Sequence, residues 1–152
     1  WRSLPQIDLT IMGDGPERAE LERIAPPHVR FVGKQPRSEA MAALRLAQAL
    51  ILPSTCFENF SLSLCEAMAH GMPVVASAFG AHAELIQHGV NGLLVSPGDA
   101  RALATAVAAA FADAAGLAAL GKAGAETWAR HLSPQANLEQ LLAIYRAAMS
   151  DG

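Results

Sequence analysis

Two glutamates eight positions apart, Glu58 and Glu66, are the residues best suited by type and spacing to do chemistry. In the run Glu58-Asn-Phe-Ser-Leu-Ser-Leu-Cys-Glu66, we predict that the first lies in a loop and the second two turns into the following helix. At 1.5 Å of rise per residue they stand roughly 12 Å apart along the axis. The acid and base of a glycosidase sit about 5–9.5 Å apart, so a longer ligand fits this pair better.

The start of that helix supplies a second element of recognition. Backbone amides near Phe60, Ser61 and Leu62 would form the positive helix end, which suits a diphosphate between the two glutamates. Each carboxylate could accept hydrogen bonds from sugar hydroxyls, and the arrangement suits a nucleotide sugar. The alternative interpretation is that Glu66 lies on a solvated helix face and Glu58 in a surface loop.

Two further loops carry glycine or lysine after an apolar run. Gly13 and Gly15 open a helix and would let amides approach a phosphate, or they form only a tight turn. They do not belong to a G-x-G-x-x-G motif, and the P-loop signature is absent from the sequence. Lys34 follows Gly33 and either reaches a phosphate or is solvated.

The cysteines and histidines predict no reactive or metal-binding cluster. The five histidines are too scattered along the chain for a ligand set. Cys65 falls among apolar helix residues and should lie in the core, whereas Cys56 is more open but has no evident base near it. We expect His70, at a helix end, to interact with the helix dipole.

Short apolar runs alternate with helical patterns along the chain, and they predict the strands and helices that would position these residues. The loops named above each follow a predicted strand, and ligands of open α/β sheets bind beyond the carboxyl ends of the strands. We therefore predict a doubly wound, Rossmann-like α/β domain with a parallel sheet covered on both faces. The predicted strands are 7–12, 29–32, 50–52, 73–76 and 92–95, and the helices between them are 17–24, 38–47 and 62–70.

The strands stop at Asp99, and the rest of the chain is predicted to be helical. Asp99 can cap a helix over 101–111, and Ser133-Pro134 provides a cap and a first-turn proline for the last helix. Between them we expect a helix over 117–131, with limits blurred by three glycines.

Composition narrows the functional classes. The 152 residues are 52% hydrophobic and 16% charged, with a formal net charge of -3 and 5% aromatic residues. Such a chain offers no basic surface for nucleic acid. Neither a membrane span nor a signal peptide is evident, and two cysteines fit a reducing compartment. We expect a single globular domain in the cytoplasm.

The sequence resembles the C-terminal half of retaining glycosyltransferases of family 4, which have the two-domain GT-B fold. Six collinear stretches carry the resemblance across about two-thirds of the chain, in the family's order. They are Ile11-Met-Gly-Asp-Gly-Pro16, Val29-Arg-Phe-Val-Gly33, Leu52-Pro-Ser54, Glu58 to Ala76, Gly80-Ala-His-Ala-Glu84 and Gly89 to Asp99.

That resemblance implies a role for each matching residue in binding a nucleoside diphosphate sugar. Glu58 would be the catalytic carboxylate nearest the donor hexose, and Glu66 would hold the ribose hydroxyls. Gly33 and Lys34 would line the base pocket, and Glu84 would be the acid that closes the fourth loop. The remaining implied donor-binding residues are Gly13, Gly15, Ser54, Phe60, Ser61, Leu62 and Gly80. The resemblance implies no metal and no cofactor besides the nucleotide-sugar substrate.

Three departures from the family pattern qualify this prediction. The fourth loop has Gly80-Ala81 where two glycines are usual, and Gln48 stands where an aspartate is common. The upstream strand with its Gly-Arg-Leu end, and the lysine that grips the diphosphate, have no counterpart here. We therefore expect residues 1–152 to be one donor domain that lacks its first strand and helix and its N-terminal acceptor domain.

The implied activity is transfer of a sugar, with retention, to a glycan or lipid acceptor. The expected partners are a nucleotide sugar and the N-terminal domain of the same protein, through which alone the enzyme would touch a membrane. Two alternatives remain: a nucleotide-sugar epimerase of related fold and a non-catalytic α/β binding module. An NAD-binding domain fits less well, because the glycine fingerprint and its acid are absent.

Overall fold

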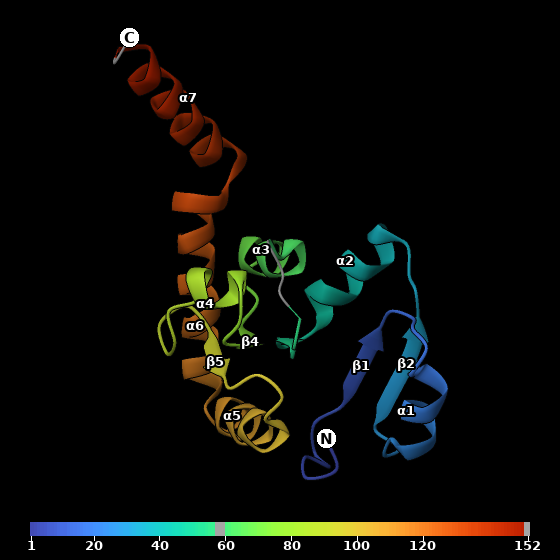
Figure 1. Cartoon of the computed structure of the whole chain (residues 1–152). Helices are drawn as coiled ribbons and strands as arrows, with labels where there is room; N and C mark the ends of the chain where they lie inside the picture. The colour runs from blue at the N-terminus through green and yellow to red at the C-terminus, as the bar shows by residue number, and fades with distance from the viewer. Residues whose placement is uncertain (57–59, 151–152) are drawn as a thin grey trace.

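The computed structural model describes residues 1–56 and 60–150, which form five parallel strands in two sheets. Strand β1 (Leu9–Met12) pairs with β2 (Val29–Gly33). In the second sheet β3 (Leu50–Leu52), β4 (Val74–Ser77) and β5 (Leu93–Val95) pair in that order. Figure 1 shows the β1–β2 pair set beside the other three strands. The predicted parallel arrangement is confirmed, but the strands do not form one continuous sheet.

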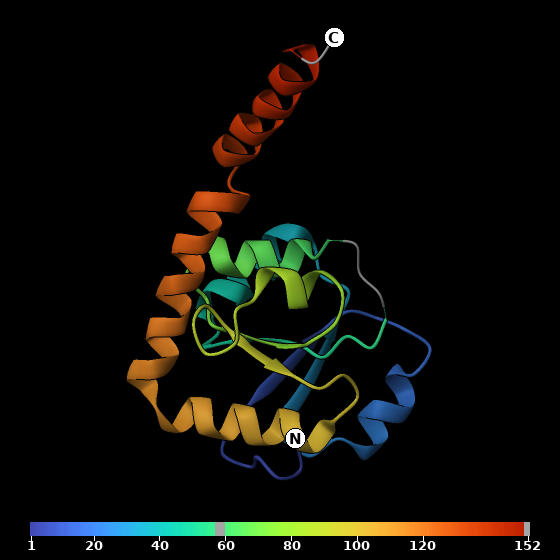
Figure 2. The same ribbon diagram turned by 60° about the vertical axis from the view of Figure 1, so that its left-hand side comes forward.

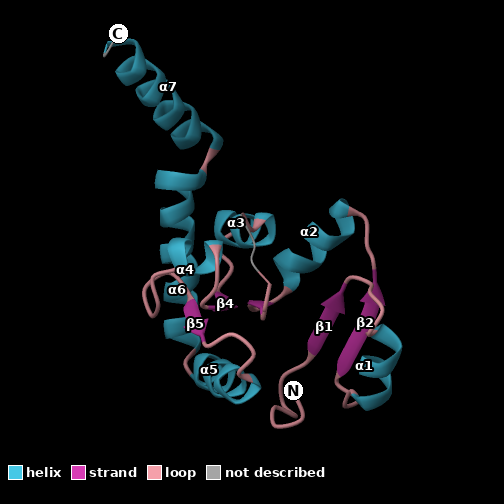
Figure 3. Ribbon diagram, in the orientation of Figure 1, coloured by secondary structure: helices cyan, strands magenta, loops and turns pink. Residues whose placement is uncertain are grey.

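A helix follows each strand (Figure 3), and the alternating pattern predicted each of these helices except the one after β4. The predicted limits agree with the structure to within one or two residues for the first three helices. Residues 81–85 were expected as part of a loop and instead form a helix, too short for its periodicity to be recognised. These helices are α1 (Arg18–Ile24), α2 (Arg37–Leu46), α3 (Leu62–Ala69) and α4 (Ala81–Leu85).

Strand β4 is the centre of the core, because all four of its residues are buried. Val74 and Ala76 belong to a cluster with Leu64 and Met68 of α3. Val75 belongs to another cluster, together with Val95 and Val107. Since side chains alternate along a strand, α3 covers one face of β4 and the helix carrying Val107 covers the other. The sheet around β4 is thus covered on both faces, as a doubly wound fold requires.

After β5 the chain is helical, as predicted. Asp99 Oδ1 accepts hydrogen bonds from the backbone N–H groups of Arg101 (3.0 Å) and Ala102 (2.8 Å) and so caps α5 (Ala100–Ala112). Next come α6 (Ala114–Thr127) and a π-helical turn, η1 (Trp128–Leu132). The expected helix over 117–131 therefore starts earlier and changes its winding before its end.

The last helix, α7 (Pro134–Ser150), begins at the predicted cap, where Ser133 Oγ accepts from the N–H of Ala136 at 3.2 Å. Figure 2 shows α7 running past the rest of the molecule. Ala136 is its buried residue, while Leu138, Leu141 and Tyr145 are between 44% and 59% exposed. The body of the domain therefore does not cover the apolar side chains of α7.

A test of length and hydropathy finds no single described helix that could cross a membrane. One bent pair, Ala100–Ala112 with Ala114–Ser150, passes this test by length and composition and turns through 103° at its break.

Candidate functional site

The loops after β1 and β2 are joined directly. The N–H of Gly13 donates to the carbonyl of Gly33 at 2.9 Å. Gly13 has a φ of 135° and Gly33 a φ of 70°, a region that side chains disfavour, so both turns depend on glycine. Two of the predicted donor-binding glycines thus lie side by side at the carboxyl ends of adjacent strands.

Within the first loop, the amide of Gly15 donates to Asp14 Oδ1 at 2.9 Å. Gly15 therefore takes part in a local turn, which was the alternative interpretation of this glycine pair. Sequence reasoning did not single out Arg18, whose guanidinium lies against Gly33. A Cβ atom at Gly33 would stand 2.8 Å from Arg18 Nη1, so a larger residue there would displace the arginine.

Arg18 is held in this place by acidic neighbours on its own turn. Its Nε donates to Glu22 Oε1 at 2.8 Å, and its Nη1 lies 3.7 Å from Asp14 Oδ2. The hydrogen bond to Glu22 raises the pKa of Arg18. The i, i+4 spacing of these acids around a basic residue is a signal that could have predicted both pairs.

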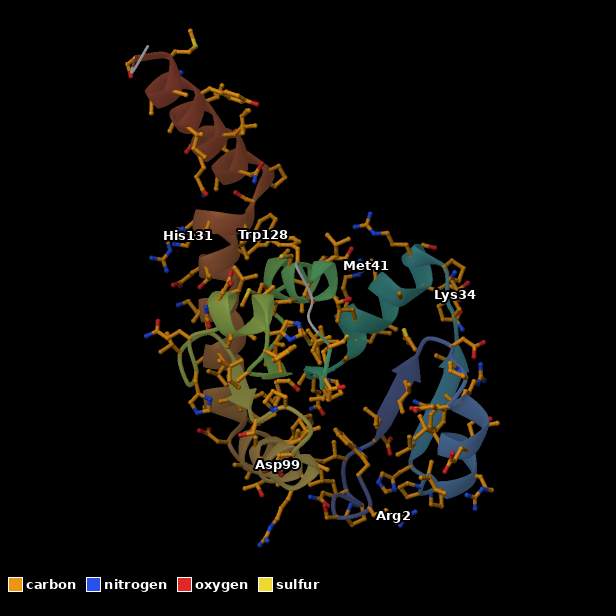
Figure 4. All side chains as sticks on the ribbon, viewed as in Figure 1. Arg2, Lys34, Met41, Asp99, Trp128 and His131 are labelled. Atoms are coloured by element: carbon orange, nitrogen blue, oxygen red, sulfur yellow. The ribbon has the colours of Figure 1, made fainter. Side chains whose placement is uncertain are left out.

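Lys34 lies exposed in the segment between β2 and α2, labelled in Figure 4. That position leaves its ammonium in contact with solvent at the mouth of the second loop.

The third loop leads from β3 into α3. Of its predicted site residues, Glu58 lies outside the described residues, and Ser54 is half-buried after β3. Ser61 is buried and precedes the first residue of α3; its carbonyl accepts from the N–H of Cys65 at 3.2 Å. Phe60 and Leu62, by contrast, are 55% and 69% exposed. The helix start therefore faces solvent with an apolar residue on each side of it.

Glu66 is the best-defined polar residue of the site, and it lies little more than one turn into α3 rather than two, because the helix begins at Leu62. Its side chain is 27% exposed, and it forms an ion pair with Arg37, the first residue of α2. Arg37 Nη2 and Nε donate to the same carboxylate oxygen, Oε1, at 2.6 and 3.1 Å. This contact joins the helix after the second loop to the helix after the third, and sequence reasoning did not anticipate it.

Two neighbours of Glu66 behave as expected. Cys65 is buried, and burial, with a smaller contribution from the charge of Glu66, raises the pKa of its thiol. It is therefore a core residue rather than a nucleophile. His70 is the C-cap residue that directly follows α3, and its Nδ1 lies 2.8 Å from the carbonyl oxygen of Glu66. This ring caps the helix terminus, as its position predicted.

The fourth loop differs from the expected geometry in one respect. Gly80 has a positive φ of 53° and directly precedes α4, whose first residue, Ala81, is buried. The sharp turn therefore needs only one glycine, so alanine at the second position does not distort the backbone. Glu84 lies exposed on α4 rather than in the loop itself.

A small hollow of about 140 Å³ lies at the carboxyl ends of the second sheet. Its lining includes Pro53, Ser77, Val95 and Ser96, and it is closed at one side by Leu103 of α5. A typical small-molecule site measures about 300–1,000 Å³, so this hollow alone is too small for a nucleotide. Among the described residues, no three His, Cys, Asp or Glu side chains gather as metal ligands.

Fold and loops together define an α/β domain whose polar and glycine-rich positions follow the strands, the arrangement of nucleotide-binding proteins. Residues 2–113 match the model of the family described as glycosyl transferases group 1, and the chain belongs to that family. Over 119 residues it is 37% identical to the glycogen synthase of Mycobacterium tuberculosis. That alignment covers 75% of this chain and 28% of the relative.

Solved structures show the same fold. Sucrose-phosphate synthase from Thermosynechococcus elongatus superimposes with a TM-score of 0.81 at 33% identity, over 99% of this chain and 40% of that one. Anabaena HepE in complex with UDP-glucose superimposes with a TM-score of 0.78 at 25% identity, over 95% of this chain and 42% of that one. The chain thus has the fold of one half of a GT-B glycosyltransferase and spans less than half the length of these proteins.

Proposed function

We propose that this chain is the donor-binding half of a retaining glycosyltransferase, which transfers a sugar from a nucleoside diphosphate sugar to a glycan or lipid acceptor. The observation that carries the proposal is Glu66, held by Arg37 one turn behind the start of α3. This places an anionic acceptor of hydrogen bonds next to a helix end that attracts phosphate.

The distances suit the parts of a nucleotide sugar. Leu62 and Glu66 are roughly 6 Å apart along the axis of α3, by the rise of 1.5 Å per residue. A diphosphate at the first-turn amides therefore leaves the ribose within reach of the Glu66 carboxylate. Gly33 and Lys34 would form the base pocket through the second loop. The hexose would be met by Glu58, which lies outside the described residues.

Remaining donor contacts are assigned to the other strand ends. Gly13, Ser54 and Gly80 would border the nucleotide through backbone atoms. Gly15 would contribute through the shape of its turn, because its amide is bonded to Asp14. Glu84 would meet the sugar from α4. The complex of HepE with UDP-glucose supports a nucleotide sugar as the ligand of this fold.

In the proposed reaction the bond between the anomeric carbon and the phosphate oxygen breaks on the same face on which the acceptor oxygen bonds. The departing phosphate takes the proton of the acceptor hydroxyl, and the configuration at the anomeric carbon is retained. The chain's own contribution is to stabilise the negative charge that develops on the phosphate, through the amides at the start of α3. No metal or further cofactor is required in this proposal.

Titration of the isotope-labelled chain with UDP, GDP and ADP, followed by nuclear magnetic resonance, tests donor binding. Glu66→Ala should weaken the binding roughly 10- to 160-fold, since a hydrogen bond to a charged group is worth about 1.5–3 kcal/mol. Glu20→Ala, an acid in the first turn of α1, is the control. Failure of all three nucleotides to bind would favour a non-catalytic module. Conversion of a nucleotide sugar without an acceptor would favour an epimerase.

We also propose that residues 1–152 are a single donor domain completed by one more strand and helix and by an N-terminal acceptor domain. Among the described strands, β1 pairs only with β2, and β3 only with β4. The edges of β1 and β3 are therefore open, and a parallel strand between them would unite the two sheets. Open edges of this kind are usually paired or covered in folded proteins.

A groove supports the presence of the accompanying helix. It measures about 880 Å³ and lies between the β1–β2 pair with α1 on one side and α5 on the other. Most of its walls are apolar, with Leu9, Ile11, Leu21 and Ile24 facing Ala104 of α5. A right-handed connection into β1 would put its helix on the same face as α1, where this groove opens.

Fusing a designed apolar strand and amphipathic helix ahead of Trp1 tests this domain proposal. The fusion should raise the midpoint of thermal unfolding and slow hydrogen exchange at the edges of β1 and β3. The control fusion carries serine at the apolar helix positions. Equal exchange in both fusions would contradict the proposal.

The full enzyme is proposed to work in the cytoplasm, with contact to a membrane only through its acceptor domain. In support, both cysteines are free thiols, Cys65 in the core and Cys56 at the surface. Free thiols persist in a reducing compartment. Fractionation of cells that express the full-length protein, with detection by antibody, tests this location.

A further inference from the structure

Arg37 stands at a position where a basic residue is disfavoured. It is the first residue of α2, where the positive end of the helix dipole disfavours a cation. Its side chain is 82% exposed, so no packing interaction accounts for its presence. A residue that violates the preference of its own helix is expected to have a compensating interaction elsewhere.

The compensating interaction is with the carboxylate that the proposed function assigns to the ribose. Arg37 directs two nitrogens, Nε and Nη2, to Oε1 of Glu66 rather than one nitrogen to each carboxylate oxygen. Its guanidinium thereby fixes the position of one oxygen, while the other, Oε2, has no hydrogen-bond partner among the described residues. The two residues are 29 positions apart, so α2 and α3 must both be in place for the contact.

We propose that Arg37 is a positioning residue of the donor site, which holds Oε1 of Glu66 so that Oε2 accepts a hydrogen bond from a ribose hydroxyl. This inference rests on the proposed function. Arg37 acts through Glu66 and has no contact of its own with the nucleotide. It also ties the helix behind the second loop, on the base side, to the helix behind the third loop.

A consequence distinguishes positioning from general stabilisation. If Arg37 only strengthened the fold, its loss would weaken the binding of all nucleotides alike. If it orients Glu66 toward a hydroxyl, its loss should weaken the binding of a ribonucleotide and leave the binding of a nucleotide without that hydroxyl unchanged. An exposed ion pair contributes up to about 1 kcal/mol, so the change in affinity should reach at most about fivefold.

The experiment compares dissociation constants of the chain for UDP, 2′-deoxy-UDP and 3′-deoxy-UDP by nuclear magnetic resonance titration, with the guanosine and adenosine series in parallel. Arg37→Ala should lower the preference for the ribonucleotide over one deoxy form by up to about fivefold. Arg37→Lys should restore part of it. Arg45→Ala, in the last turn of the same helix, is the matched control and should change nothing.

A double-mutant cycle completes the test. In the Glu66→Gln background, Arg37→Ala should have no further effect on the ribonucleotide preference. Equal weakening of UDP and its deoxy forms by Arg37→Ala would overturn the inference and indicate a direct contact with the diphosphate. An unchanged preference would also overturn it, while binding of UDP would leave the proposed function intact. Absence of binding by every nucleotide would overturn both.

Discussion

The Cα atom of Gly121 in α6 faces the carbonyl group of Gly71, which lies in the segment between α3 and β4. A Cβ atom at position 121 would lie 2.1 Å from the carbonyl oxygen and 3.1 Å from the carbonyl carbon of Gly71. Gly71 itself has a φ of 66°, so its backbone conformation is not easily changed. α6 can therefore pack this closely on the segment between α3 and β4 only with glycine at position 121.

Gly121→Ala should destabilise the chain by about 1–3 kcal/mol, since the added methyl group forces backbone apart in a packed region. Urea denaturation followed by circular dichroism measures the change. Gly124→Ala in the same helix is the control. A Cβ atom there would meet Asn91 at 3.4 Å, an ordinary contact, and alanine favours the helix. Equal stability of the two variants would show that the α6 contact is looser than described.

Most helices and strands of this fold could be predicted because their formation depends mainly on residues that are neighbours in the sequence. β4 and α3 were readily predicted, since apolar β-branched residues and helical spacing are properties of neighbouring residues. The Asp99 and Ser133 caps were predicted for the same reason. The π-helical turn at Trp128 was not predicted. In Figure 4 Trp128 lies at the end of α6, and it packs against the core cluster of α3, so tertiary contacts determine its winding.

Relationships between distant elements could not be predicted from the sequence alone. The pattern marked β1 and β3 as strands, but only the fold shows that they have open edges. Glu66 could be assigned to a helix, yet its partner Arg37 depends on how α2 lies against α3. The angle between two neighbouring helices depends on many side chains at once. The spacing of residues within either helix therefore does not predict that angle.

Removing residues 138–152 should leave the body of the domain intact. The deleted part of α7 contributes exposed side chains such as Leu138 and Tyr145. The midpoint of thermal unfolding should therefore stay nearly the same. Removing residues 128–152 instead also deletes Trp128 and Leu132, which pack on the core cluster, and should lower stability strongly. A large loss from the shorter truncation would mean that α7 packs against the body.

Nucleotide binding by this chain should not depend on a divalent metal. Glycosyltransferases that hold the diphosphate through a metal use an Asp-x-Asp pair, and no two aspartates of this sequence have that spacing. The amides at the start of α3 would carry the interaction with phosphate instead. Titration with UDP, GDP and ADP should give the same dissociation constants in EDTA and in magnesium or manganese. A dissociation constant at least tenfold lower with metal would contradict this expectation.

The isolated chain should bind a nucleotide weakly, with a dissociation constant of ~1 mM, and should not transfer sugar. Its described residues form a core around β4 and a helix end with Glu66, which are sufficient for folding and a few contacts. Transfer also requires an acceptor held close to the anomeric carbon and a site closed to water. Opposite the strand-end loops, the described residues present no second wall that would hold an acceptor.

Incubation with UDP-, GDP- and ADP-sugars and a panel of glycan and lipid acceptors, analysed by mass spectrometry, should therefore yield no glycosylated product. Glu66→Ala serves as the control for any trace activity, since contamination would survive this substitution. Sustained transfer that is lost in Glu66→Ala would show that the domain needs no partner.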